Sequence, residues 1–503
     1  MATDLRTKRG PDGLPASRPT GRFRIPVSVP ARSDIAWIWA TAVALFALYA
    51  TVSIRLHQRI LSSGFDLGLN EQAVRGWAHL GWPIVELEGP GMNQLGDHFS
   101  PVLALIGPFY RLFPTPITLL VVQAALLAVA VVPLASCAQR LLSRRAAVVV
   151  AAGYGLSWGI AETVGFDFHE VAFAVPLTAC SVVALIDQRY GAAVAWALPM
   201  LLVKEDLGVT VAVLGGLVAW AGRRRLGLAT AAVGIAASAV EMLVIIPHFV
   251  PGHTFAAWRV AHHATSPHLL WPFVRAYTVG LFQPQDKVVT MLMLVAPTAL
   301  LALRSRLTLL VVPTLLWRFG SSNWPYWGTQ FHYNAALMPI VFGALIDTMR
   351  RWSPAQAATR TREALALSAG VTLALVPAHP LWSVVEPDTW RHESRVTDAR
   401  AMLAQVPPGV WVAASNRLVP QLTSRDQVTV FGWAPSRPNP EYLALEDADP
   451  LNWPFDSLDD QRRMENVALH LGYVQVFKQG NYVLLHRSTN DTRQFPPPPQ
   501  PSS

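Results

Sequence analysis

About eleven apolar segments, each long enough or nearly long enough to span a lipid bilayer, constrain the fold of this sequence more than any other feature. A spanning helix needs roughly 20 apolar residues, so segments 190–203 and 307–318 are short for this role. The series predicts a polytopic α-helical membrane protein. The expected spans are residues 35–54, 116–138, 146–161, 170–186, 190–203, 207–222, 226–247, 288–303, 307–318, 331–348 and 364–382.

The charge of the chain supports this class. Only 14% of its 503 residues are charged, whereas soluble domains carry roughly 25%. The formal net charge is +8, and the Lys and Arg residues cluster in short runs between apolar segments. That pattern indicates membrane topology, and no nucleic-acid partner is expected. The two cysteines, Cys137 and Cys180, lie in apolar segments and form neither a metal-binding motif nor a disulfide framework.

The basic residues also orient the chain, because cytoplasmic loops are enriched in Lys and Arg. If eleven spans alternate, the N-terminus is cytoplasmic, and so are five basic loops at 139–145, 187–190, 222–225, 304–306 and 350–362. The opposite loops hold nearly all the membrane-proximal acids and histidines. These outer loops are residues 55–115, 162–169, 204–206, 248–287 and 319–330.

Four regions are expected along the chain. Residues 1–34 form a disordered basic cytoplasmic tail, and residues 35–383 form the transmembrane domain. Within the first outer loop, segment 101–113 is apolar but too short to span, so we expect a re-entrant or interfacial helix. In 384–488, short β-type runs at 410–415, at 427–431 and on either side of the Gly-Asn turn at 480–481 alternate with helical stretches, which predicts a small extracytoplasmic α/β domain. The Pro-rich residues 489–503 are expected to be disordered.

The outer loops carry the candidate functional residues. Ionisable groups at a membrane edge are costly, so their gathering on one side predicts a polar cavity that opens outward. Its acids offer a general base and ligands for a divalent cation such as Mg²⁺ or Mn²⁺, and its basic residues can hold a phosphate. The candidates are Asp66, Glu71, Asp97, His98, Asp167, His169, Glu170, Lys204, Glu205, Asp206, Arg259 and Arg318.

Several of these residues also have a purely structural explanation. Asp66 could cap the helix that follows it, and Glu71 could pair with Arg75 at i,i+4 on a helix surface. Asp97 could be a turn acid. The stretch from Asp167 to Glu170 could be a solvated loop, and the three charges of KED at 204–206 could neutralise one another.

A series of motifs resembles a known family. FDLGLNEQAVRGW, LGDHFSPVLALIGPFYRL, LLVVQAALLA, FDFHEVAFAVPL and KEDLGV occur in the order found in the bacterial membrane family of domain of unknown function 2079. The downstream ASNRLVPQLTSRDQVTVF resembles the outer C-terminal portion of that family. The resemblance covers most of residues 35 to 487. The family in turn resembles the GT-C superfamily of glycosyltransferases, which use polyprenyl-phosphate sugars on the outer side of the membrane.

The resemblance implies roles for particular residues. Asp66 matches the acid that GT-C enzymes carry after their first span, and Asp167, with Glu170 near it, matches a second acid. We therefore expect Asp66 and Asp167 to be catalytic and the other candidates to bind substrate. If a metal ion is bound, its ligands would be Asp66, Asp167 and Glu170. The first loop lacks an adjacent Asp-Glu or Asp-X-Asp, so the metal and the acceptor class stay undefined.

The resulting hypothesis is an inverting GT-C-like glycosyltransferase of the bacterial plasma membrane. It would move a sugar from a polyprenyl-phosphate donor to a glycan, lipid or protein acceptor of the cell envelope. In this reaction a carboxylate takes the proton of the acceptor hydroxyl. The alternatives are a transporter or flippase of a lipid-linked or polar solute, which would favour ionisable residues near the bilayer midplane, and an inactive membrane scaffold.

Overall fold

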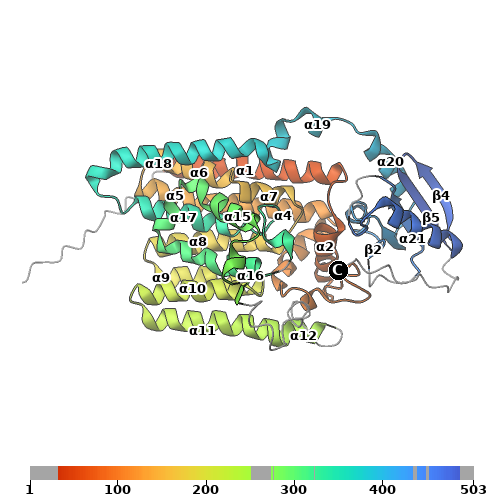
Figure 1. The fold of residues 1–503 in the computed structure, drawn as a ribbon, viewed down its shortest axis with the longest axis horizontal. Helices are drawn as coiled ribbons and strands as arrows, with labels where there is room; N and C mark the ends of the chain where they lie inside the picture. The colour runs from red at the N-terminus through yellow and green to blue at the C-terminus, as the bar shows by residue number, and fades with distance from the viewer. Residues whose placement is uncertain are drawn as a thin grey trace, which may run out of the picture.

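The structure is a computed structural model, and it describes residues 32–250, 274–275, 277–321, 323–433, 439–448 and 453–487. A bundle of helices forms one end of the molecule, and a small sheet with flanking helices forms the other (Figure 1). Arg259 and the tails 1–31 and 488–503 lie outside the described residues.

The bundle is built from apolar helices that lie roughly parallel to one another (Figure 1). Four helical stretches are long and apolar enough to cross a membrane: Ile35–Gln58, Pro116–Leu141, Arg144–Gly165 and Arg224–Phe249. The shorter apolar stretches of the described chain are Pro101–Leu112, Glu170–Ile186, Tyr190–Leu202, Leu207–Trp220 and Leu337–Met349. The fold is therefore a helical membrane bundle, while the count of eleven spans and the orientation of the termini stay predictions.

The α-helices of the bundle and its loops follow the chain in this order: α1 (Arg32–Gln58), α2 (Leu69–Ala78), α3 (Gly107–Leu112), α4 (Pro116–Val129), α5 (Val131–Leu141), α6 (Arg144–Gly155), α7 (Trp158–Gly165), α8 (Ala174–Ile186), α9 (Tyr190–Ala197), α10 (Leu207–Trp220), α11 (Arg224–Val240), α12 (Ile246–Phe249), α15 (Gln285–Val295), α16 (Val312–Gly320), α17 (Leu337–Met349) and α18 (Pro354–Leu375). Helix α17 is the centre of the bundle, because every one of its residues is buried.

Small residues decide how closely α10 and α11 pack. A methyl group on Gly215 would lie 2.6 Å from the backbone of α11 at Gly227 O, and one on Gly227 would lie 2.4 Å from Gly215 O. Glycines therefore allow the two backbones to touch. Such close packing drives the association of helices in a bilayer, because lipid tails are as apolar as the helices and the hydrophobic effect does not bring the helices together. Another side of α11 exposes Leu228 and Ile235, as expected of a face that meets lipid.

Segment 101–113 forms two short helices, η3 (Pro101–Ile106) and α3. Leu103, Ile106 and Tyr110 are buried, whereas Leu105, Phe109 and Leu112 are exposed. The segment is thus a pair of short helices with an apolar face exposed to the surroundings. This form suits the interfacial helix that the sequence predicts, although its position in a membrane stays a prediction.

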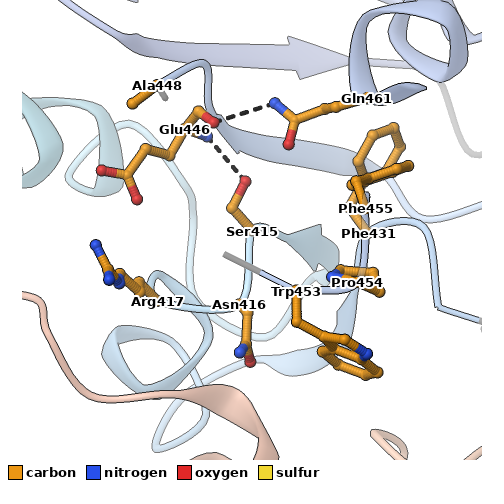
Figure 2. Close-up of a pocket in the computed structure, with 10 residues that line it drawn as sticks. All are labelled: Ser415, Asn416, Arg417, Phe431, Glu446, Ala448, Trp453, Pro454, Phe455 and Gln461. Atoms are coloured by element: carbon orange, nitrogen blue, oxygen red, sulfur yellow. Dashed lines mark hydrogen bonds between the residues drawn. The ribbon is translucent and has the colours of Figure 1, made fainter. Parts of the chain in front are cut away.

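The C-terminal unit is a five-stranded mixed sheet in the order β2-β1-β3-β5-β4. Strands β1 (Trp411–Ala414), β2 (Gln427–Val430) and β3 (Tyr442–Glu446) run parallel, and β5 (Tyr482–His486) is antiparallel to β3 and to β4 (Val474–Gln479). The helices of this unit are α19 (Pro387–Trp390), α20 (Ser394–Leu403) and α21 (Leu458–His470). Strand β3 does not appear in the sequence-based reading. Ser415, Asn416 and Arg417 follow β1 at the carboxyl edge of the sheet (Figure 2).

The sheet and the first outer loop share one hydrophobic core. Side chains of α2, such as Ala73 and Val74, are fully buried in the same cluster as Val412 and Val419 of the C-terminal unit. Polar contacts extend this interface, because Asn416 Oδ1 accepts hydrogen bonds from the backbone N–H groups of Gly64 (2.8 Å) and Phe65 (3.2 Å). The sheet is therefore joined to the chain immediately before Asp66.

This interface predicts that Gly64 tolerates no side chain. A methyl group there would lie 2.7 Å from Val419 Cβ and 3.0 Å from Asn416 Oδ1. We expect Gly64→Ala to lower the free energy of unfolding by about 1–3 kcal/mol, measured as a lower thermal midpoint of the purified protein in detergent. The matched control is Gly216→Ala, because a methyl group at Gly216 in α10 meets nothing within 4 Å. Equal midpoints for the two variants would contradict the interface described here.

Candidate functional site

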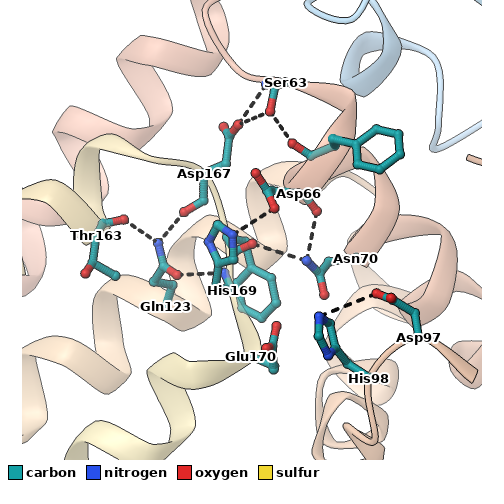
Figure 3. A network of polar contacts seen from close by, with 12 residues as sticks. Ser63, Asp66, Asn70, Asp97, His98, Gln123, Thr163, Asp167, His169 and Glu170 are labelled. Carbon is teal, nitrogen blue, oxygen red and sulfur yellow. Dashed lines mark hydrogen bonds and ion pairs between the residues drawn. The ribbon is translucent and has the colours of Figure 1, made fainter. Parts of the chain in front are cut away.

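Three of the loops that the sequence predicts on the outer side meet where the bundle faces the sheet. The side chains involved are defined here as the outer polar cluster: Asp66, Glu88, Asp97, His98, Asp167, His169, Glu170, Lys204 and Glu205. Most of them are drawn in Figure 3. Ion-pair contacts join the first loop to the second through Asp66 and His169, the second to the third through Glu170 and Lys204, and the first to the third through His98 and Glu205. The expected convergence of these loops is present in the structure.

The carboxylate of Asp66 is partly exposed, as is that of Asp97, whose side chain is 26% exposed. The side chain of Asp66 is 30% exposed, whereas that of His169 is only 4% exposed. His169 Nε2 lies 2.9 Å from Asp66 Oδ1, within ion-pair distance but without the alignment of a hydrogen bond. The backbone of Asp66 has φ of 115° and ψ of −75°, a conformation that costs of order 1–3 kcal/mol and that concentrates at functional sites.

Asp66 does not cap a helix. It lies in the irregular turn η1 (Gly64–Gly68), and the residue that precedes α2 is Gly68, which provides no side-chain cap. Instead, the backbone carbonyl of Asp66 accepts a hydrogen bond of 2.8 Å from Asn70 Nδ2. The turn therefore directs the Asp66 carboxylate toward His169 rather than toward the start of α2.

Asp167 is buried behind this turn. Its Oδ2 accepts hydrogen bonds from the backbone N–H of Ser63 (2.7 Å) and from Ser63 Oγ (3.0 Å). Burial raises the pKa of Asp167 to about 6, with the nearby Asp66 charge acting in the same direction and the Ser63 hydrogen bonds opposing it. Because Asp167 contacts the chain three residues before Asp66, its geometry is that of a group that positions Asp66.

Asp167 also has a backbone φ of 48°, and its loop is held by a residue that the sequence did not single out. Gln123 on α4 donates to Asp167 O (2.5 Å) and Thr163 O (3.2 Å), and its Oε1 accepts from His169 N (3.0 Å). A buried glutamine that satisfies three backbone groups fixes an irregular loop. The loop is thus neither solvated nor free, which answers the structural explanation left open above.

The ring of His169 is also fixed from its other side. His332, in the loop between α16 and α17, stacks on it with ring centroids 3.4 Å apart. Phe166 stacks on His169 at 5.3 Å. His169 therefore has one orientation, with Nε2 directed at Asp66.

A second group of charges surrounds His98. His98 Nδ1 lies 2.8 Å from Glu205 Oε1, and His98 Nε2 lies 3.6 Å from Asp97 Oδ2. Burial alone would lower the pKa of His98, but the negative charges of Asp97 and Glu205 outweigh it and raise the pKa to about 10. The two carboxylates thus favour the protonated form of His98. It is 36% exposed, so solvent screens part of this interaction.

Glu88 is an acid of this cluster that the sequence-based reading missed. Burial and the neighbouring Asp97 carboxylate raise the pKa of Glu88 to about 8, with His98 opposing them. The segment ELEGPG between α2 and the GDHFSP turn was the only signal that could have drawn attention to it.

The KED triplet does not neutralise itself, because each member has a partner outside it. Lys204 Nζ lies 2.7 Å from Glu170 Oε1, Glu205 meets His98, and Trp317 Nε1 donates to Asp206 Oδ2 at 2.8 Å. Burial raises the pKa of Asp206 to about 6. The triplet therefore holds three neighbouring segments together.

Two predicted substrate-binding residues, Glu71 and Arg318, lie outside the outer polar cluster. Glu71 is fully buried on α2, where it accepts hydrogen bonds from Tyr110 Oη (2.8 Å) and from Thr423 Oγ1 of the C-terminal unit. Burial raises the pKa of Glu71 to about 7. Arg75 does not form the expected ion pair with Glu71 but donates to the carbonyls of Thr423 and Asp426. Glu71 and Arg75 therefore belong to the interface with the sheet.

Arg318 is also fully buried. Its guanidinium donates to Tyr326 O (2.8 Å), Gly328 O (3.0 Å) and Asn334 Oδ1 (2.8 Å). These contacts occupy its donors and order the loop that carries His332, so the geometry gives Arg318 a structural role.

A metal site can be assessed from the donor groups themselves. Within the described residues, no three side chains of His, Cys, Asp or Glu come together in an arrangement that could hold a metal ion. Of the three ligands expected, Glu170 is paired with Lys204 and Asp167 with Ser63. The binding of Mg²⁺ or Mn²⁺ stays a prediction.

Comparisons with known proteins give one family and one fold. A family model described as "Predicted membrane protein (DUF2079)" matches residues 56–484. The crystal structure of ArnT from Cupriavidus metallidurans bound to undecaprenyl phosphate is 13% identical, with a TM-score of 0.52 over 92% of this chain and 99% of that one.

The apo state of the same ArnT gives 13% identity and a TM-score of 0.49 over 90% of this chain and 98% of that one. The likeness of fold rests on the first structure alone. No curated protein matches this chain.

The buried ion pair of Glu170 and Lys204 allows a test of whether these two side chains stabilise the fold or face a substrate. Their side chains are 6% and 14% exposed. We expect Lys204→Gln to lower the free energy of unfolding by roughly 3–5 kcal/mol, because it leaves Glu170 buried without its ion-pair partner. The double variant Glu170→Gln/Lys204→Gln should lose less free energy of unfolding than Lys204→Gln, as judged by thermal unfolding.

The control is Arg391→Gln, which removes an ion pair whose partners are 72% and 74% exposed and should cost less than about 1 kcal/mol. If Lys204→Gln costs no more than this control, the Lys204 ammonium is not needed by Glu170 and is available to a substrate.

Proposed function

We propose that this chain, which belongs to the DUF2079 family of membrane proteins, is a GT-C-like glycosyltransferase that uses a polyprenyl-phosphate sugar. The observation that carries the proposal is Asp66, an accessible carboxylate held in a costly backbone conformation against His169. Strain of this kind persists only where the surrounding structure imposes it, which favours a functional role.

The likeness to ArnT supports the same reading. ArnT is a GT-C glycosyltransferase, and its structure contains undecaprenyl phosphate. A fold alone does not determine a function, so the proposal for this chain depends on the chemistry of the outer polar cluster. The cluster lies at the end of the bundle that meets the sheet, because the turn that carries Asp66 is hydrogen-bonded to Asn416 of the C-terminal unit. This placement favours an enzyme over a transporter, whose ionisable groups would lie nearer the midplane.

Asp66 is the proposed general base. As the acceptor hydroxyl oxygen attacks the anomeric carbon of the donor sugar, its proton passes to the Asp66 carboxylate. The bond between the anomeric carbon and the phosphate oxygen breaks, and polyprenyl phosphate leaves with the electron pair. A single displacement of this kind inverts the anomeric configuration.

The remaining residues of the proposed site position and balance charge. His169 orients the Asp66 carboxylate, and Asp167 holds Ser63, which fixes the start of the turn. Lys204 neutralises the buried Glu170 carboxylate beside the proposed base. No step depends on a metal ion. The acceptor is a glycan, lipid or protein of the cell envelope, and the reaction takes place on the outer face of the membrane.

The role of Asp66 as general base predicts that the variant Asp66→Asn loses most of its sugar-transfer activity. An amide keeps the shape of the side chain but cannot accept the acceptor proton, so we expect transfer to fall by roughly 10²–10⁴-fold. The measurement is transfer of radiolabelled sugar from a panel of polyprenyl-phosphate sugars to envelope extracts by the purified protein. Glu71→Gln is the matched control, because Glu71 lies in the interface with the sheet. Unchanged transfer by Asp66→Asn would overturn the proposed base.

The proposal also predicts how the transfer activity falls on the acidic side of its pH profile, called the acid limb here. Asp167 holds Ser63 more strongly while it is ionised, because a carboxylate is a stronger acceptor than a carboxylic acid, so transfer should fall as the pH drops through about 6, the pKa of Asp167. Ser63→Ala removes a hydrogen bond that lowers this pKa, so the acid limb should move to higher pH. Asp167→Asn has no group that titrates here and should lose this limb. An acid limb that is identical in wild type and Ser63→Ala would contradict the assignment.

A further inference from the structure

A basic cleft lies where the first helix of the bundle meets the segment that leads into the C-terminal unit. One wall is the end of α1, and the other runs from α19 to α20, between the bundle and the sheet (Figure 1). The space open to the centre of a water molecule is about 160 Å³, whereas one water needs roughly 10–15 Å³ on this measure. The charged side chains that line the cleft are four arginines and one acid: Arg55, Arg59, Arg391, Arg400 and Glu393.

The acid of this basic cleft is already neutralised. Arg59 Nε lies 2.5 Å from Glu393 Oε1, and Arg395 Nη2 lies 3.3 Å from Glu393 Oε2. Arg391 pairs with Asp388, and both of these side chains are largely exposed. Glu393 therefore has two arginines as partners and does not balance the remaining positive charge of the cleft.

The other two arginines, Arg55 and Arg400, have no acidic partner within the part of the chain that the structure describes. Arg55 donates to Gln58 Oε1 (3.0 Å) and Thr389 O (2.7 Å), and its buried Nε has no hydrogen-bond partner. Arg400 donates to Gln58 O (3.0 Å). These acceptors hold the two guanidiniums in place, but they are uncharged. The cleft therefore keeps an excess of positive charge, which favours an anionic ligand.

The position of the cleft indicates which anion it meets. Arg55 lies in the last turn of Ile35–Gln58, a stretch long and apolar enough to cross a membrane, and we expect the end of a spanning helix to lie near the lipid headgroups. Trp390 lines the cleft, is 52% exposed and lies under the Arg55 guanidinium, 5.3 Å from the ring centroid. Trp382 and Val385 of the same segment are also exposed. Tryptophan is enriched at the membrane interface, so this segment is suited to contact lipid.

We propose that the basic cleft binds the phosphate of an anionic phospholipid such as phosphatidylglycerol. The phosphate accepts charge-assisted hydrogen bonds from Arg55 and Arg400, and the exposed ring of Trp390 packs against the apolar part of the lipid. Basic pockets beside spanning helices recognise anionic headgroups through the same chemistry. A zwitterionic lipid fits less well, because its ammonium group is repelled by the arginines. A free phosphate makes the polar contacts but lacks the apolar one.

This inference goes beyond the proposed function and does not depend on it, because no residue of the cleft belongs to the outer polar cluster. Arg55 is on α1 and Arg400 is on α20. A phosphate held by both arginines therefore joins the bundle to the C-terminal unit.

The binding experiment is native mass spectrometry of the full-length protein, purified in detergent and depleted of lipid. The probes are phosphatidylglycerol, phosphatidylcholine with the same acyl chains, and sn-glycerol 3-phosphate, which carries the phosphate without acyl chains. We expect phosphatidylglycerol to bind saturably and at least about tenfold more tightly than either of the other two.

Variants locate the binding. Arg55→Gln/Arg400→Gln should weaken phosphatidylglycerol by at least about tenfold. Arg462→Gln/Arg463→Gln is the matched control, because it removes the same charge from two exposed arginines of α21, and it should bind as wild type does. If the first double variant lowers the thermal midpoint, Arg400→Gln decides, because Arg400 is exposed. This single change should weaken the lipid by about threefold or more.

The lipid site is overturned if phosphatidylcholine or sn-glycerol 3-phosphate binds as tightly as phosphatidylglycerol. It is also overturned if the folded variants at Arg55 and Arg400 bind phosphatidylglycerol as tightly as the control does. Asp66→Asn should bind this lipid as wild type does. A wild-type protein that binds phosphatidylglycerol in the cleft but transfers no sugar would remove the proposed function and leave the lipid site.

Discussion

The contact between Asn416 and the backbone at Gly64 is the constraint on which the proposed site depends. Asp66 lies in a backbone conformation that side-chain-bearing residues rarely adopt, so something outside the turn must hold it there. Asn416 holds the turn from the sheet, and Ser63, fixed by Asp167, holds it from the bundle. The two halves of the molecule thus meet at the proposed base, and neither half alone would fix it.

Charge pairing decides which ionisable residues can act on a substrate. Glu170 and Lys204 face each other, and so do His98 and Glu205, because buried charges are tolerated mainly when they are paired. Arg318 and Glu71 are occupied by structural partners. Asp66 keeps the most exposed carboxylate of the pairs that join the loops, and this is why it, rather than Asp167, is the proposed base.

Much of this arrangement could be predicted from the order of motifs. The apolar segments predicted a helical membrane bundle, and the loops with Asp66, His98, Asp167 and Lys204 were expected on one side, where the structure brings them together. The roles of Gln123 and Glu88 could not be predicted, because a single polar residue in an apolar or Gly-rich stretch has no periodic pattern. Strand β3 was missed for a similar reason: a five-residue run can be strand or helix until its neighbours are known.

The sequence by itself determined the class of fold and most members of the polar cluster, because the length of an apolar segment and the position of a charge beside it are local properties that decide how a segment lies in a bilayer. Only the tertiary structure decided which of these charges remain accessible. Whether Arg318 binds a phosphate or a set of carbonyls depends on the loop at 324–334 that folds over it. Whether Asp66 caps a helix or faces His169 depends on a contact with Asn416, 350 positions farther along the chain. Such partners are set by packing between distant segments, and no local pattern records them.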